Sequence, residues 1–388
     1  MDRNSSGNGS PFEFDDLSSY SSPKEYNKKR KNKRGRVVLK SIIAVFCCLL
    51  IGGGIALTYI STDLLSGLST VSISKDKDVL GIPDLDLNTD SVVNIALFGV
   101  DTRSNAFTGN ADTIMILSID NKHNKIKLIS ILRDSTVLIE GQGDKGYINW
   151  VTKINAAYAE GGPELAIRTI NTNFNTNIYD YVTVNFVQMA KIVEAFGGTT
   201  ITITDAEMQQ INNNLAMTMK QNPDSGVTEN DYISESGTVH LNGNQAVAYG
   251  RIRKIDSDFE RVKRQQAVVS GLLESASKLP KSEYYSLAKE LFPMCETSFT
   301  GFDDIFSLAP IIINGFTIEK INVPDAEVEV NLFDGEDSSG VWVLTYDLDV
   351  ASQRIEAFIY EDQSQYYDQY KDYFDGLRNK RNNNSFGE

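Results

Sequence analysis

Cysteine and histidine are scarce in this chain. Its 388 residues include three cysteines and two histidines. Cys47 and Cys48 lie in an apolar stretch near the N-terminus, which leaves Cys295 alone in the remainder. A lone thiol excludes a disulfide framework and a thiolate metal site. His123 and His240 supply too little material for a Ser-His-Asp hydrolase or a histidine-rich zinc site. Any chemistry must therefore use carboxylates, arginines and lysines.

Positive charge is also in deficit over most of the chain. The formal net charge is −15, but residues 1–40 carry +5 and residues 41–60 carry none, which leaves −20 for residues 61–388. Such an acidic balance argues against nucleic acid as a ligand. A local cluster of cations in this background therefore stands out, because it is maintained against the surrounding field.

Only one stretch lacks charge for long enough to cross a bilayer. It reads SIIAVFCCLLIGGGIALTYIST from residue 41, and the basic run KKRKNKRGRVVLK precedes it. Positive flanks stay cytoplasmic, and the roughly forty polar residues before the stretch favour an uncleaved anchor over a signal peptide. We expect a disordered cytoplasmic tail over 1–40, a transmembrane helix over 41–60 and an extracellular spacer over 61–90.

Strand and helix patterns alternate in the exported part. Apolar runs of strand length occupy 94–100, 112–119, 125–132, 179–186, 199–203, 316–324 and 340–346. Helical periodicity occupies 152–174, interrupted by Gly-Gly-Pro, then 187–196, 262–279, 281–292, 302–314 and 351–362. This order predicts an α/β layer fold in one domain over 91–375. The polar segment 205–237 has a weak helical start and is expected to be a mobile flap, and 376–388 a flexible tail.

The segment YGRIRKIDSDFERVKRQQ, residues 249–266, holds six cationic side chains. If it begins extended, Arg251 and Arg253 leave the backbone on one face. If a helix begins near Asp258, then Arg261, Arg264 and Gln265 share a face as well. Arginine matches phosphate oxygens with a planar fork. The segment thus favours a phosphate site, and a solvated helix paired with its own acidic residues is the alternative.

Further charged residues follow apolar strands, where α/β sheets build ligand sites. Asp101 ends NIALFGVD, and Arg133 with Asp134 ends LISILRD. Asp112 begins the next strand after Asp101, so the two carboxylates converge if those strands are antiparallel neighbours. Two carboxylates together with phosphate oxygens are typical of a magnesium site. Lys153, placed at the start of a helix, is within reach of a phosphate at the sheet edge.

Six blocks in order resemble one protein family. They are GVDTR, ADTIMILSID, SILRDS, TKINAAYAEGG, VEAFGGTTITI and VHLNGNQAVAYGRIRKIDSDFERVKRQQ. This series, over nearly all of 92–350, resembles the LytR-CpsA-Psr (LCP) family of bacterial wall enzymes. The resemblance implies an LCP-type domain with a central mixed sheet flanked by helices. It also implies transfer of an anionic glycopolymer, of teichoic acid or capsule type, from a polyprenyl pyrophosphate carrier to peptidoglycan, with Mg²⁺ or Mn²⁺.

The resemblance assigns roles to particular residues. It implies metal ligands at Asp101 and Asp112 and a basic position near the pyrophosphate at Lys153. Catalytic roles are implied for Arg133, Asp134, Arg251 and Arg253. The pyrophosphate is expected to contact Arg133, Arg251, Arg253, Arg261 and Gln265. Asp134 is expected to orient Arg133 or to assist proton removal.

Two departures from the family pattern keep other functions open. Asn110 stands where the family often has arginine, and Leu132 where it usually has proline. Loss of a phosphate contact at Asn110 is expected to lower activity or change the donor. The alternatives are a polyprenyl pyrophosphate phosphatase and a non-enzymatic receptor or scaffold for lipid-linked wall precursors. The sequence does not identify the polymer, the acceptor hydroxyl, the general base, the oligomeric state or the role of the cytoplasmic tail.

Overall fold

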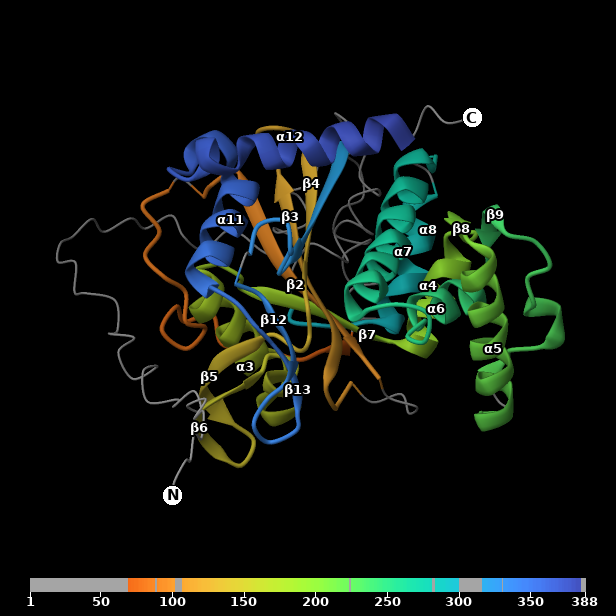
Figure 1. Ribbon diagram of the computed structural model, residues 1–388, viewed down its shortest axis with the longest axis horizontal. Helices are drawn as coiled ribbons and strands as arrows, with labels where there is room; N and C mark the ends of the chain where they lie inside the picture. The colour runs from red at the N-terminus through yellow and green to blue at the C-terminus, as the bar shows by residue number, and fades with distance from the viewer. Residues whose placement is uncertain are drawn as a thin grey trace, which may run out of the picture. The chain divides into compact units, whose positions relative to one another are not determined.

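A seven-stranded mixed sheet organises the computed structural model of the protein (Figure 1). The structure describes residues 69–384, except for residues 88, 102–106, 223–224, 281–282, 300–315 and 330. All of the described residues belong to one compact unit of the chain, Val37–Glu388. The predicted helix at 302–314 lies outside the described residues.

The sheet is built from strands in the order β1-β10-β7-β2-β3-β4-β11. Their bounds are β1 Ser69–Thr70, β2 Val92–Val100, β3 Ala111–Asp120, β4 Lys125–Ile131, β7 Asp180–Asn185, β10 Glu296–Thr297 and β11 Thr317–Val323. β2, β3 and β4 pair antiparallel in sequence order, whereas β7 joins β2 and β11 joins β4 in parallel. The predicted α/β fold with a central mixed sheet is confirmed.

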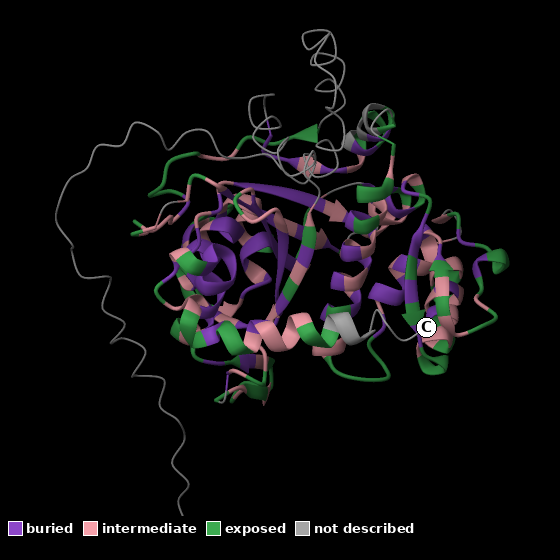
Figure 2. Ribbon diagram, turned by 90° about the horizontal axis from the view of Figure 1, so that it is seen from above, coloured by how far each residue is buried: buried purple, intermediate pink, exposed green. Residues whose placement is uncertain are grey.

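Helices cover both faces of this sheet. The helices are α3 Ala156–Phe174, α4 Phe186–Ala195, α5 Asp205–Gln221, α6 Gly243–Gly250, α7 Asp258–Lys278, α8 Tyr284–Leu291, α11 Leu348–Tyr360 and α12 Tyr367–Asn384. One core lies between the sheet and α4, α6 and α7, and a second lies between the sheet and α3, α11 and α12. Alternate residues of β2 enter opposite cores, Ile95 the first and Phe98 the second. Figure 2 shows buried residues concentrated along the strands and the inner helix faces. Burial on both sides explains why the strands read as continuous apolar runs.

Three two-stranded sheets complete the described part of the fold. β5 Thr136–Gly143 and β6 Gly146–Lys153 form one hairpin, and β12 Phe333–Glu336 and β13 Trp342–Thr345 form another. β8 Thr199–Ile203 pairs with β9 Gly237–Leu241. Short 3₁₀ turns occupy Glu229–Asp231, Phe292–Met294 and Glu361–Gln363. The β5–β6 hairpin and β12 were not predicted, because their polar and glycine residues obscure the alternation.

The structure corrects three predicted boundaries. Part of the expected spacer belongs to the domain, because β1 pairs with β10 and Leu80 is fully buried in the second core. The expected flap begins as a helix of 17 residues, α5, which a capping box at Thr204 and Glu207 starts and which Ile211 and Leu215 anchor in the first core. The expected loose tail is largely helical, because α12 continues to Asn384.

No helix in the described part of the chain is both long enough and apolar enough to cross a membrane. The predicted transmembrane segment, residues 41–60, lies outside the described residues, as does the predicted cytoplasmic tail.

Candidate functional site

Asp112 occupies a β-bulge near the start of β3. Gly99 of β2 pairs with Thr113, and Val100 pairs with Ala111, so Asp112 is the extra residue between these pairs. A bulge bends the strand and changes the direction of its side chain. A Cβ on Gly99 would stand 2.8 Å from the Cβ of Thr113, so glycine permits this close approach. The bulge thus sets how the Asp112 carboxylate is presented at the end of the sheet.

The Asp112 carboxylate links two arginines from distant parts of the chain. Arg133, in the turn after β4, donates from Nη1 to Oδ1 at 2.7 Å. Arg253, between α6 and α7, donates from Nη2 to Oδ2 at 2.7 Å. Burial raises the pKa of Asp112, but Arg133 and Arg253 more than offset this effect and hold the pKa below its ordinary value. Asp112 is therefore ionised at neutral pH.

Asp134 extends this network to Lys153. Its Oδ2 accepts from Nε of Arg133 at 3.2 Å, and its Oδ1 lies 2.7 Å from Nζ of Lys153. Lys153 is the last residue of β6, where it pairs with Thr136, and not the start of a helix as predicted. Asp134 is itself 7% exposed, so it holds both cations from a protected position.

Buried Arg261 pairs with half-buried Asp258 in the first turn of α7. Arg261 is 1% exposed, and its Nη2 donates to Oδ2 of Asp258 at 2.7 Å. Nε of Arg133 lies 3.6 Å from the same carboxylate. Burial raises the pKa of Asp258 and lowers the pKa of Arg261 to about 10, so the arginine stays charged at neutral pH.

Two nitrogens of Arg261 make no hydrogen bond within the described residues. They are Nε and Nη1, although Nη1 lies 2.6 Å from Oδ1 of Asp258, outside hydrogen-bond geometry. A buried donor without an acceptor costs roughly 1–3 kcal/mol, and more when it is charged. These donors favour an anionic ligand that supplies the acceptors.

Arg251 and Asp101 line the same cavity, beside the cluster around Asp112. Helix α6 continues to Gly250, so the predicted extended segment from 249 to 253 does not form. The Arg251 guanidinium carbon lies 4.8 Å from the centre of the Phe186 ring. Arg251, Phe186 and Asp101 line a cavity of about 310 Å³ between α4, α5 and α6, whose lining mixes polar and apolar residues. Asp101 follows β2 directly, and Val100, the last residue of β2, pairs with Ala111, the residue before Asp112. The two aspartates therefore lie at the same end of adjacent antiparallel strands.

Arg264 has a structural role and is not part of the cluster. Its Nε donates to Glu207 of α5 at 2.8 Å, and its Nη2 pairs with Asp256. Arg261 and Arg264 lie three residues apart on α7, as the sequence predicted, but Arg264 pairs with Glu207 and Asp256 rather than with the cluster.

Gln265 of α7 lines an apolar cavity. Its Nε2 donates to the Gly250 carbonyl at 3.3 Å, and its Oε1 has no hydrogen-bond partner within the described residues. The cavity, of about 110 Å³, lies between the sheet and α4, α6 and α7. Its lining is almost entirely apolar and includes Leu97, Met115, Val182, Met189, Val268, Leu272 and Cys295. Thr113, the residue after Asp112, also lines this cavity, so its wall begins one residue from the cluster.

Comparison with known proteins places this arrangement in a family. The sequence profile of the LytR_cpsA_psr family matches residues 58–358, which is most of the chain. The chain belongs to the LytR-CpsA-Psr family. A relative from Bacillus mycoides, named polyisoprenyl-teichoic acid–peptidoglycan teichoic acid transferase TagU, is 28% identical over 82% of this chain and 95% of its own. A relative of the same name from Enterococcus faecalis is 28% identical over 72% of this chain and 83% of its own.

Solved LCP structures share the fold. A structure of YwtF (TagT) with bound octaprenyl pyrophosphate lipid matches with a TM-score of 0.51 and 21% identity, over 74% of this chain and 99% of its own. A TagT structure bound to LIIa-WTA matches with a TM-score of 0.54 and 23% identity over the same shares of both chains. A protein from Streptococcus agalactiae matches with a TM-score of 0.58 and 23% identity, over 76% of this chain and 93% of its own.

The structure divides the residues that the LCP resemblance assigned. Ion pairs and hydrogen bonds join Asp112, Arg133, Asp134, Lys153 and Arg253 into one network, which Asp258 extends to Arg261. Asp101 and Arg251 line the cavity between α4, α5 and α6, and Gln265 lines the apolar one. From the sequence, Asp258 was considered only as an acidic partner that would neutralise the arginines of a solvated helix. Its position three residues before Arg261, on one helix face, was the signal that could have identified it as part of the network.

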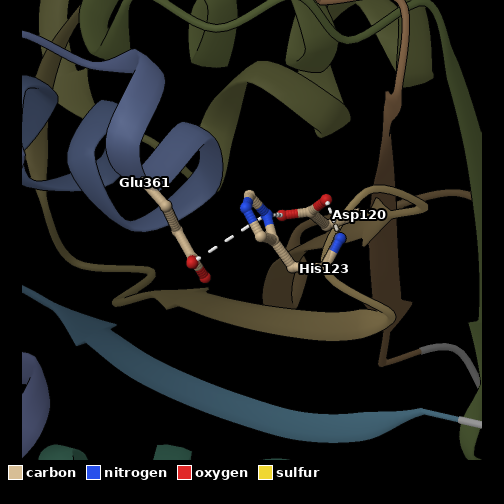
Figure 3. Close-up of side chains that lie close together, drawn as sticks. All are labelled: Asp120, His123 and Glu361. Atoms are coloured by element: carbon tan, nitrogen blue, oxygen red, sulfur yellow. Dashed lines mark hydrogen bonds and ion pairs between the residues drawn. The ribbon is translucent and has the colours of Figure 1, made fainter.

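A second cluster lies at the opposite end of β3 and consists of Asp120, His123 and Glu361 (Figure 3). Their ligand atoms lie within 4.8 Å of one another, as a metal site requires. However, Lys127 Nζ lies 2.8 Å from Asp120 Oδ2 and 3.0 Å from Glu361 Oε1, and Lys125 Nζ lies 2.7 Å from the same Glu361 oxygen. The two ammonium groups already neutralise both carboxylates, so the cluster needs no cation to be stable.

Proposed function

We propose that this protein transfers an anionic wall glycopolymer from a polyprenyl pyrophosphate carrier to peptidoglycan. The observation that carries the proposal is the Asp112–Arg133–Arg253–Arg261 cluster, together with an apolar cavity that Thr113, the residue after Asp112, lines. A diphosphate attached to a prenyl chain has the matching chemistry, because it is strongly anionic at one end and apolar at the other. Relatives named as teichoic acid transferases, and an LCP structure with bound octaprenyl pyrophosphate, support the same assignment.

Each end of the carrier has a place in the site. The prenyl chain enters the apolar cavity between the sheet and α7, where Leu272 and Val268 exclude water from it. The diphosphate accepts hydrogen bonds from Arg133, Arg253 and the two Arg261 nitrogens that make no hydrogen bond within the described residues. Lys153 adds a positive charge at the edge of this site. Arg251 and Gln265 flank it from the two cavities.

The reaction is a displacement at phosphorus. A hydroxyl of peptidoglycan attacks the phosphorus atom that bears the sugar, so a new oxygen–phosphorus bond forms. The bond from that phosphorus to the bridging oxygen breaks, and polyprenyl phosphate leaves with the bridging oxygen. The hydroxyl proton is released. Arginines fixed before the reaction stabilise the charge that develops on the leaving phosphate, which is how enzymes of this kind gain most of their rate.

Asp134 is the positioning residue in this scheme. It accepts from Arg133 and pairs with Lys153, and it thereby holds two cations toward one anion. Asp101 and Asp112 supply carboxylate oxygens, the ligands that Mg²⁺ and Mn²⁺ prefer, and they end adjacent strands. When bound there, such a cation supplies further neutralisation of the diphosphate. Asp112 becomes available to it as the diphosphate draws Arg133 and Arg253 to itself.

The same proposal includes the location of the protein. Residues 41–60 anchor it in the cell membrane in a single pass, residues 1–40 remain cytoplasmic, and the LCP domain is extracellular. This topology places the site on the side of the membrane where peptidoglycan is found.

The test uses the full chain in detergent with a polyprenyl-pyrophosphate-linked glycopolymer and soluble peptidoglycan. Release of polyprenyl phosphate is expected to require peptidoglycan and to be lost in Asp112→Asn and Arg253→Ala. Lys263→Ala is the matched control, since this exposed lysine of α7 pairs only with Glu260 among the described ion pairs. Full turnover in both site variants would overturn the proposal. Release without peptidoglycan would show a polyprenyl pyrophosphate phosphatase, and binding without release would show a receptor.

A further inference from the structure

Large exposed apolar side chains gather on two hairpins beside the charged cluster. Of twelve such side chains among the described residues, seven belong to β5–β6 or to β12–β13 and its turn. They are Leu138, Tyr147, Trp150 and Val151 on the first hairpin and Phe333, Val341 and Trp342 on the second. Single exposed apolar residues are ordinary, but a group of them marks an interaction surface.

The two hairpins join into one surface that reaches the site. The amide of Leu344 in β13 donates to the carbonyl of Asp134 at 2.9 Å, and Ser135 forms a parallel bridge with Leu344. The hydroxyls of Thr345 and Thr136 lie 3.3 Å apart. Figure 1 shows β5, β6, β12 and β13 together on this side of the domain.

Strand pairing places the active-site lysine on the same face as the exposed rings. Lys153 pairs with Thr136, and alternation puts Tyr147 on the Lys153 face of β6. Phe333 pairs with Thr345, whose side chain contacts Thr136. We call this face the hairpin surface, defined by Lys153, Leu138, Val151, Tyr147 and Phe333. Trp150 and Trp342 alternate to the opposite face of their strands from the hairpin surface, and both are exposed.

The exposed rings are held in fixed positions. The Tyr147 hydroxyl donates to Glu140 at 2.7 Å, and the Trp342 indole donates to Asp334 at 2.7 Å. The Phe333 ring lies over Gly335, where an added Cβ would stand 3.1 Å from its Cζ. Side chains that are already ordered lose less entropy when they bind. These features fit a surface prepared for a ligand.

Charge identifies the chemistry of that ligand. The hairpins carry five carboxylates and two lysines. They are Glu140, Asp144, Asp334, Glu336 and Asp337, with Lys145 and Lys153. This balance repels an anionic wall polymer and an anionic lipid surface. Uncharged sugar rings suit it instead, because their C–H faces pack on the negative face of an aromatic ring and their hydroxyls donate to carboxylates.

We propose that the hairpin surface binds the glycan strand of the acceptor, a chain of N-acetylhexosamine units. The role of the hairpin surface as the acceptor site rests on the proposed transferase function. Binding of a glycan to this surface does not depend on that function. A strand lying along β6 toward Lys153 brings one of its hydroxyls to the diphosphate. The surface thus determines which polymer is modified, and the arginine cluster determines which carrier is used.

Intrinsic fluorescence tests this directly, because the only two tryptophans of the chain, Trp150 and Trp342, lie on these hairpins. The full chain in detergent is titrated with chito-oligosaccharides and with soluble peptidoglycan strands. A saturable change in emission is expected. Tyr147→Ala and Phe333→Ala should each weaken binding by roughly two- to tenfold, the value of one aromatic contact. Tyr232→Ala, an exposed tyrosine after α5, should bind as the wild type does.

The outcomes separate this inference from the proposed function. In transfer assays the Tyr147 and Phe333 variants should show a raised KM for peptidoglycan with unchanged binding of octaprenyl pyrophosphate. Glycan binding without any transfer would leave the surface established and the transferase proposal refuted. No response to glycan, equal binding by all variants, or a response only to anionic lipid vesicles would overturn the inference. The last result would instead identify a membrane-contact surface.

Discussion

Replacing Arg133 by lysine keeps the charge of the site and removes the planar fork of donors. Arg133 uses Nη1 for Asp112 at 2.7 Å and Nε for Asp134 at 3.2 Å, and its side chain is 19% exposed. A lysine ammonium in this position reaches only one of these carboxylates. One charge-assisted hydrogen bond of this kind contributes about 1.5–3 kcal/mol. The same nitrogens donate to the diphosphate in the proposed reaction, so the lost hydrogen bond raises the barrier by this amount. We therefore expect Arg133→Lys to lower turnover by about ten- to 150-fold.

The assay measures release of polyprenyl phosphate from the lipid-linked donor, with a thermal melt of each variant. Arg378→Lys is the matched control. Arg378 of α12 donates to both oxygens of Glu319 at 3.0 and 2.9 Å and is 28% exposed, and its ion-pair partners Glu319, Glu361 and Asp375 lie outside the site network. It should lose stability as Arg133→Lys does and keep full turnover. Turnover of Arg133→Lys within about twofold of the wild type, at unchanged melting temperature, would refute the role of the fork.

Three further predictions follow from other contacts. Chelation of divalent cations should abolish turnover and added Mg²⁺ should restore it. His123→Ala should respond to both treatments as the wild type does, and loss of this response in His123→Ala would move the metal site to the far end of β3. Burial raises the pKa of Glu207, but the bond from Arg264 holds it below its ordinary value. Its stabilising contribution is therefore present above its unfolded pKa of about 4.3 and lost as pH falls through the lower folded pKa. Acid unfolding of Glu207→Gln should be less steep in that range, and an identical acid limb would contradict this. Glu329→Gln should lower the free energy of unfolding by about 3–5 kcal/mol, because it leaves a buried arginine of α11 without its charge partner. Glu327→Gln, in an exposed pair, should cost about 0–1 kcal/mol, and equal losses in denaturant titrations would count against the distinction.

Local pattern was sufficient for the layers of the domain. The strands of the central sheet are buried on both faces, so their runs of valine, isoleucine and leucine are continuous and easily recognised. Helix α7 was predicted over 262–279 from its periodicity, and the Ser257 cap starts it earlier, at Asp258. Helix α5 was predicted only as a weak helical start, because only Ile211 and Leu215 of its polar sequence are buried. Burial of so few residues leaves little periodic signal.

The sequence by itself determined the chemical inventory of this protein. It has almost no thiol or imidazole, an excess of acidic residues and one basic segment at 249–266. The order of six sequence blocks over 92–350 also indicated the LytR-CpsA-Psr family. Only the tertiary structure decided which of these groups meet. Asp112 lies in a bulge of β3, and α6 ends at Gly250. With this backbone, Arg253 bonds the Asp112 carboxylate, whereas Arg251 lines the cavity between α4, α5 and α6. These contacts join residues up to 141 positions apart, and such separations are set by the packing of the sheet and helices, which no local periodicity records.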